Sequence, residues 1–322
     1  MVLPLATSVL GFVFAGLVLD QWWQRRHSFQ LVWAIGLMWY AVAAGSEFGG
    51  EAFGWSARLY RTWYLIGAFL VPAYLGAGTL YLLTKTRFGY FVGASVLLGG
   101  LFSLLATRQY AGSTTGGVVA FGIALLAAAA IAWATAFRRE MQGHVAMAFL
   151  AAGTVVVAVL VFTALISGVV LDPHTHVPIA AGFPGYLRVS SVPFNAGGGL
   201  ALIFGALYSA YIYMPKRRVL SARFAVLAIA VNFVVSLPGA TSALFAGRLS
   251  SRVPATILIA FGSLVPAITS GLNRFGVTWS FFLGEFFGLV LIFAGFLVSE
   301  EVFRNVRLGA TLWSRPAVSL ER

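Results

Sequence analysis

Long apolar runs separated by short polar connections repeat along the whole chain. Each run has about 20 residues, the length that an α-helix needs to cross the hydrocarbon core of a bilayer. Because lipid offers backbone groups no water, we predict helices; a β-barrel would show ten-residue segments of alternating hydrophobicity. The predicted fold is an all-α, polytopic membrane bundle of about ten helices. The predicted spans are Val2–Leu19, Phe29–Ser46, Thr62–Leu83, Phe88–Thr107, Gly117–Phe137, Val145–Leu171, Val189–Met214, Ala222–Ala246, Val253–Leu272 and Val277–Ser299.

Basic residues in the connections predict the orientation, because cytoplasmic loops carry an excess of Lys and Arg. With the N-terminus outside, the first seven spans place the larger basic set inside. The inner set is Arg25, Arg26, Lys85, Arg87, Arg138, Arg139, Lys216, Arg217, Arg218 and Arg223, and the outer set is Arg58, Arg61, Arg108 and Arg188. We therefore divide the chain into a seven-helix bundle (1–218), three further membrane helices packed on it (219–299) and a short basic tail at the membrane interface (300–322).

The last three spans depart from this charge pattern. Ten crossings would place four late arginines outside, namely Arg304, Arg307, Arg315 and Arg322. Alternatively, Val253–Leu272 enters and leaves on one side, because Pro254, Pro266 and Gly271 suit a re-entrant segment. That alternative gives nine crossings, whereas we expect ten.

Composition excludes several function classes. Charged residues make up 9% of the chain, against about 25% in soluble domains. The net charge of +12 lies in short loops, so it indicates anionic lipid headgroups as partners rather than nucleic acid. The lack of cysteine excludes disulfides and thiolate metal sites. An excess of Arg over Lys, with abundant Ala, Gly and Val, suggests a high-GC bacterial genome. For a multi-pass helical protein, we therefore expect the bacterial cytoplasmic membrane. No cofactor is expected, because no pair of histidines lies within the spans to hold a haem.

Glu285 is the main candidate functional residue, since it is the one charge within Val277–Ser299. Ionisable groups inside membrane spans are costly, usually face the bundle interior and often serve ions, protons or substrates. A structural alternative is a protonated carboxyl group that bonds a neighbouring helix. The polar residues expected around Glu285 are Asn195, Asn232, Thr241, Ser242 and Arg61.

Prolines within the spans predict breaks where backbone groups could bind a solute. The expected breaks lie at Pro72, Pro193, Pro238 and Pro266. Interrupted helices expose backbone groups to ions and substrates in many transporters. The alternative is an ordinary proline kink.

Two connections predicted to lie outside carry polar side chains. The loop Ser46–Glu51 holds the carboxylates Glu47 and Glu51, which we expect to pair with Arg58 and Arg61; contact with an extracellular ligand is the alternative. The longest outer loop contains Asp172, His174 and His176. Alternate histidines on an extended chain could bind zinc or copper, but the ligand set is incomplete. We therefore favour a solvated loop and predict no metal site.

Small residues predict close helix contacts. Gly284 and Gly288 are four residues apart in the last span and fit either internal packing or the seam of a homodimer. A partner in a larger membrane complex is a further alternative.

The segment Trp33-Ala-Ile-Gly36 to Trp39-Tyr40, followed by Arg58-Leu-Tyr-Arg61 and Leu65-Ile-Gly67-Ala68, resembles the seven-helix membrane sensor regions of bacterial histidine kinases. The resemblance covers at most residues 1–218 and implies a sensory role with the N-terminus outside. The chain differs in having three more spans and no kinase or other output domain, so signalling would need a separate partner. The whole chain also resembles uncharacterised bacterial multi-pass proteins.

Three functions fit these patterns. Glu285 and the interrupted helices favour a small transporter or permease with a polar site around helices seven to ten. The sensor resemblance and the glycine-rich faces favour a sensor or an accessory subunit without catalysis. An integral membrane enzyme is least expected, because acid, base and nucleophile candidates are scarce and no P-loop, HExxH or triad motif is present.

Overall fold

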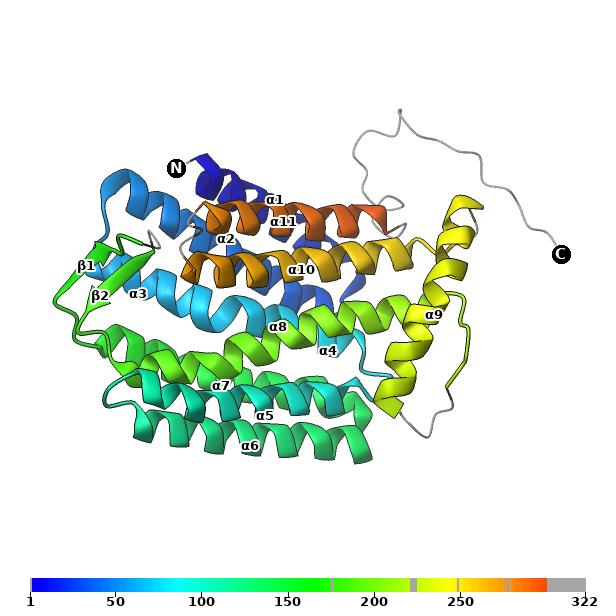
Figure 1. Cartoon of the computed structure of the whole chain (residues 1–322), viewed down its shortest axis with the longest axis horizontal. Coiled ribbons are helices and arrows are strands. Elements are labelled where there is room, and N and C mark those ends of the chain that lie inside the picture. Colours follow the sequence, from blue (N-terminus) through cyan, green and yellow to red (C-terminus); the bar gives the residue numbers. More distant parts are fainter. Residues whose placement is uncertain are drawn as a thin grey trace.

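The computed structural model describes residues 2–174, 177–220, 225–247, 249–275, 277 and 279–299 (Figure 1). Ten helical segments of this part are long and apolar enough to cross a membrane. The α-helices are α1 (Val2–Arg25), α2 (Ser28–Phe53), α3 (Ala57–Leu65), α4 (Val71–Leu82), α5 (Phe88–Ala106), α6 (Thr114–Phe137), α7 (Gln142–Thr163), α8 (Gly185–Tyr213), α9 (Ala225–Phe245), α10 (Arg252–Arg274) and α11 (Ser280–Val298). A π-helical segment, Ile66–Leu70, joins α3 and α4 into one span.

Most helices run side by side along the long axis of the molecule, so the bundle has two distinct ends (Figure 1). The hairpin end carries the antiparallel strands β1 (Gly168–Leu171) and β2 (Pro178–Ala181), in which Gly168 pairs with Ala181. The far end is the opposite one. Basic residues gather at the far end: Arg25, Arg26, Lys85, Arg87, Arg138, Arg139, Lys216, Arg217, Arg218 and Arg252.

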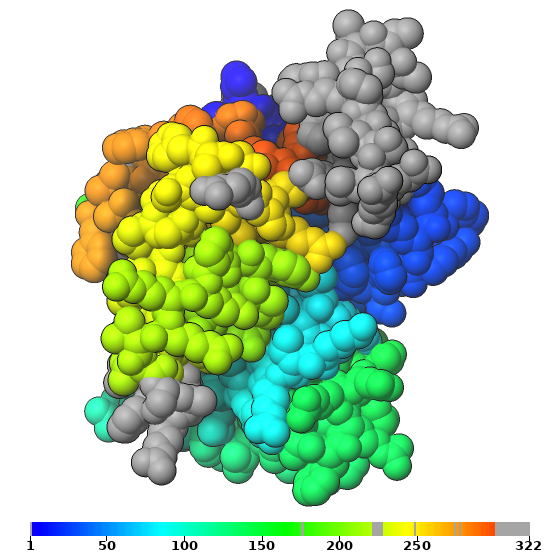
Figure 2. All heavy atoms as spheres, turned by 90° about the vertical axis from the view of Figure 1, so that its right-hand side faces the viewer, coloured from blue at the N-terminus to red at the C-terminus, as the bar shows by residue number. Residues whose placement is uncertain are grey.

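Helix α9 lies across the far end instead of along the bundle (Figure 1). Arg252, at the start of α10, donates a 2.7 Å hydrogen bond to the Tyr213 hydroxyl at the end of α8. The helices before and after α9 therefore meet at the same end. The side chain of Asn232 accepts hydrogen bonds from the backbone N–H groups of Val219 and Leu220, which fixes the middle of α9 against the preceding loop. Seen from the far end, α9 lies on this face beside the end of α8 (Figure 2).

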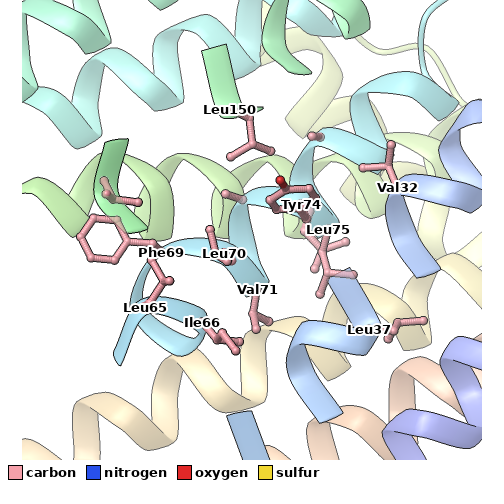
Figure 3. Close-up of a cluster of buried hydrophobic side chains, with 14 of the residues drawn as sticks. Val32, Leu37, Leu65, Ile66, Phe69, Leu70, Val71, Tyr74, Leu75 and Leu150 are labelled. Carbon is pink, nitrogen blue, oxygen red and sulfur yellow. The ribbon is translucent and has the colours of Figure 1, made fainter. Parts of the chain in front are cut away.

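The largest hydrophobic core surrounds the π-helical segment. Phe69 and Leu70 are 0% and 2% exposed, and they pack with residues from α2 and α7 such as Leu37 and Leu150 (Figure 3). The same core includes Leu289 of α11. The last helix thus shares one core with the first helices.

Glycines set the closest helix contacts. A Cβ atom on Gly198 of α8 would overlap the backbone of Pro72 and Ala73 on α4. On α11, Gly284 packs against Thr269 and Gly288 against Pro266, both on α10. These two glycines therefore pack internally against α10.

The side chain of Gln142, at the start of α7, bonds one loop and two other helices at the far end. Its side chain is 0% exposed. Its Oε1 accepts from the backbone N–H of Gly89 and the hydroxyl of Thr135, at 3.0 and 3.1 Å. Its Nε2 donates to the carbonyls of Thr84 and Thr86, at 2.8 and 3.3 Å. One amide thus joins the α4–α5 loop, α5, α6 and α7.

We expect Gln142→Ala to lower thermal stability strongly, because it leaves buried donors and acceptors unpaired at about 1–3 kcal/mol each. Thermal unfolding of the detergent-purified protein measures the effect. Gln109→Ala is the matched control, since Gln109 is exposed. Equal melting temperatures for the two variants would contradict the role given to Gln142.

The structure corrects several sequence-based predictions. The sixth span ends at Thr163 and not at Leu171, because the apolar residues that follow form strand β1. Helices α8, α9 and α10 continue through Pro193, Pro238 and Pro266, so these prolines do not interrupt them. Proline removes one hydrogen bond, which a long packed helix tolerates with a kink. Pro72 lies in the first turn of α4, directly after the π-helical segment. The re-entrant alternative for Val253–Leu272 is wrong, because α10 is one continuous helix.

Candidate functional site

Glu285 lies on the part of α11 nearer the hairpin end and keeps partial exposure. The Tyr40 hydroxyl on α2 donates a 2.9 Å hydrogen bond to the backbone carbonyl of Glu285. The Glu285 side chain lies close enough to the carboxyl group of Glu47, also on α2, for the two acids to interact electrostatically. Tyr40 and Glu47 are two helical turns apart, so one face of α2 holds both groups against α11.

Glu47 differs from the prediction, which placed it in an outer loop. Helix α2 continues through Glu47 to Phe53, and Glu47 is 3% exposed. The indole Nε1 of Trp63, on α3, donates to Glu47 Oε1 at 2.8 Å. Glu47 Oε2 accepts no hydrogen bond from any described group. The buried acid is therefore held between α3 and α11.

Two carboxyl groups this close are stable only with a proton or a cation between their oxygen atoms. Ionised carboxylates only accept hydrogen bonds, so two carboxyl groups bond each other only when one carries a proton. A cation can take the place of that proton. The interactions found for this pair come from Trp63, Tyr40 and a further acid, Glu51. The arrangement can thus hold and release one proton or one positive group.

A cavity of about 470 Å³ lies at the hairpin end, beside Glu47. Its walls come from α2, the α2–α3 connection, α3, the β-hairpin and the start of α11. The lining residues are Glu47, Gly50, Glu51, Trp55, Trp63, Leu171, Val177, Pro178, Trp279, Phe281 and Phe282. Leu171 and Trp279 are 45% and 69% exposed, so the cavity opens to the surface there. Glu47 belongs to its lining and Glu285 does not, so Glu47 stands between the cavity and Glu285.

Trp55 shapes one wall of the cavity because Gly50 makes room for it. A Cβ atom on Gly50 would overlap the indole ring of Trp55, whereas one on Gly49 would meet only Leu59, at 3.8 Å. The rings of Trp55 and Trp63 meet edge to face, with centroids 5.6 Å apart. The glycine pair that suggested a loop in the sequence therefore lets an aromatic ring lie against the helix beside Glu47.

The polar residues predicted around Glu285 lie elsewhere. Asn232 binds the loop before α9, and the Thr241 hydroxyl bonds the carbonyl of Pro238 within α9. Ser242 also belongs to α9, at the far end, and Asn195 is an exposed residue of α8. Arg61 donates to the carbonyl of Ala164 at 2.6 Å. The contacts recorded for Glu285 are with Tyr40 and Glu47.

The incomplete set of possible metal ligands, Asp172, His174 and His176, lies partly outside the described residues, which do not include His176. Asp172 Oδ1 accepts the backbone N–H of His174 at 2.8 Å, so this carboxylate stabilises the turn of the hairpin. Within the part of the chain that the structure describes, no group of three or more His, Cys, Asp or Glu residues could hold a metal ion.

Glu47 and the aromatic cavity are the features that sequence reasoning missed. The helix ends only at Gly54, which has a φ of 89° at the C-cap of α2. Extending the second span to that residue would have placed Glu47 within it.

Comparisons with family models, curated proteins and solved structures give no match. The resemblance to histidine kinase sensor regions therefore stays a prediction, and the function is argued from the site alone.

Proposed function

We propose that the protein is a multi-pass permease of the bacterial cytoplasmic membrane with nine crossings. The hairpin end faces outside and the far end faces the cytoplasm. Helix α9 then lies along the inner side, because α8 ends and α10 begins at the same end. With this topology the four late arginines follow a helix that ends on the inner side, in agreement with the positive-inside rule.

The carboxyl pair is the observation that supports transport. Glu47 borders a cavity that opens at the hairpin end and interacts with an acid on the last helix. Acids inside a bundle typically mark ion, proton or substrate pathways. The Glu47–Glu285 pair releases its shared proton when a solute enters from outside, and this release couples solute binding to movement of α11 against α2.

Proton flux tests this proposal. Proteoliposomes that enclose a pH-sensitive dye are challenged with pools of small solutes. We expect at least one pool to change the internal pH with the wild type, and Glu285→Gln to abolish the change, because an amide cannot release a proton. Glu140→Gln is the matched control, since Glu140 is exposed at the far end. Proton-coupled transport would be excluded if no solute pool changed the internal pH, or if Glu285→Gln gave the same pH change as the wild type.

Ligand sensing is a second candidate, favoured by the tight core around Phe69 and Leu70. A sensor would bind its ligand in the cavity without carrying it across. Binding without any flux in the same proteoliposomes would favour this function, and signalling would then need a partner protein.

A further inference from the structure

We propose that the cavity at the hairpin end binds a hydrophobic ammonium ion, that is, a protonated amine carrying an aromatic or alkyl group. The inference rests on the same site as the proposed permease and names its ligand class. Three features of the cavity support it: its charge, its aromatic walls and an acceptor atom without a donor.

Charge and acceptor geometry select the head of the ligand. The acidic residues of the lining are Glu47 and Glu51. Glu47 is 97% buried, and its Oε2 has no donor among the described groups. A primary ammonium group is a compact donor of three hydrogen bonds. It can bond the Glu47 carboxyl group in place of the proton that the carboxyl pair shares, so that one positive charge enters as one proton leaves.

The aromatic walls select the rest of the ligand. Trp55, Trp63, Trp279, Phe281 and Phe282 line the cavity. Indole faces attract cations and also bury apolar groups. A volume of about 470 Å³ falls in the range of sites for small molecules. An anionic ligand would instead meet two carboxyl groups, and a neutral polar one would find few partners on these walls.

A shape-matched series of probes tests the charge requirement. Binding of 2-phenylethylamine, 2-phenylethanol and phenylacetate to the full-length protein in lipid nanodiscs is measured by calorimetry. We expect the amine to bind about tenfold or more tightly than the alcohol, a difference of about 1.4 kcal/mol, and phenylacetate not to bind. Equal binding of amine and alcohol, preference for phenylacetate, or no binding of the amine at millimolar concentration would overturn the proposal.

Two variants test the location of the site. Gly50→Ala displaces the Trp55 ring and is expected to weaken amine binding about tenfold, whereas Gly49→Ala has room for its methyl group and should bind as the wild type does. Equal amine affinity of both variants would overturn the placement. Glu47→Gln should lose the preference for amine over alcohol. If this variant does not fold, the comparison of Gly50→Ala with Gly49→Ala tests the location of the site. Amine binding without any solute flux would keep this inference and reject the permease. Flux of other solutes without amine binding would keep the permease and reject this inference.

Discussion

Gly198→Ala is expected to lose most of its folded protein, whereas the neighbouring Gly199→Ala folds normally. Both changes add one methyl group to the same turn of α8 and raise helix propensity equally. At Gly198 the methyl group would overlap the Pro72 carbonyl, but at Gly199 nothing lies within 4 Å. Because backbone and not a flexible side chain blocks the space, α8 and α4 must separate. We expect a loss of about 3 kcal/mol or more in stability.

Monodisperse yield and thermal unfolding in detergent measure this pair of variants. Gly76→Ala should behave as Gly198→Ala does, because a Cβ atom on Gly76 would overlap the backbone of Gly198. Similar yields and melting temperatures for Gly198→Ala and Gly199→Ala would show that the two helices do not approach each other in this way.

Thiol labelling should place both flanks of α9 on the cytoplasmic side. The chain has no cysteine, so labelling of a single-cysteine variant reports on the introduced residue alone. Val219, before α9, and Phe245, at its end, are 62% and 91% exposed. With α9 lying across the far end, a membrane-impermeant maleimide should leave Val219→Cys and Phe245→Cys unlabelled in intact cells and label both after permeabilisation.

Phe53→Cys and Leu165→Cys are the controls for the outer side, because both positions are at the hairpin end and 86% exposed. They should be labelled in intact cells. If Phe245→Cys is labelled from outside while Val219→Cys is protected, α9 crosses the membrane and the topology has ten crossings.

Sequence reasoning found most of the helices and singled out Glu285, because long apolar runs and one isolated charge depend on local composition alone. It misplaced Glu47, since Ser46, Gly49 and Gly50 favour a turn when the ring of Trp55 is not known to lie there. Residues Val169 and Val170 continue the apolar run of α7, so strand β1 could not be separated from it by hydropathy.

The orientation of α9 could not be predicted for a different physical reason. Its length and hydropathy match those of a membrane span. Its position depends on contacts between distant segments, such as the Ser236 hydroxyl that accepts the backbone N–H of Arg217 at 2.8 Å. Contacts of this kind leave no periodic pattern in the sequence.

The two acids of the carboxyl pair are synthesised at very different times, Glu47 early and Glu285 late in translation. Tyr40, on the α2 face that holds Glu47, and the Glu285 carbonyl that it bonds are separated by 245 positions. In the proposed topology, Glu47 would therefore enter the bilayer long before the ribosome reaches its partner. A chain that stops before α11 would lack Glu285, the acid that interacts with Glu47 in the longer chain.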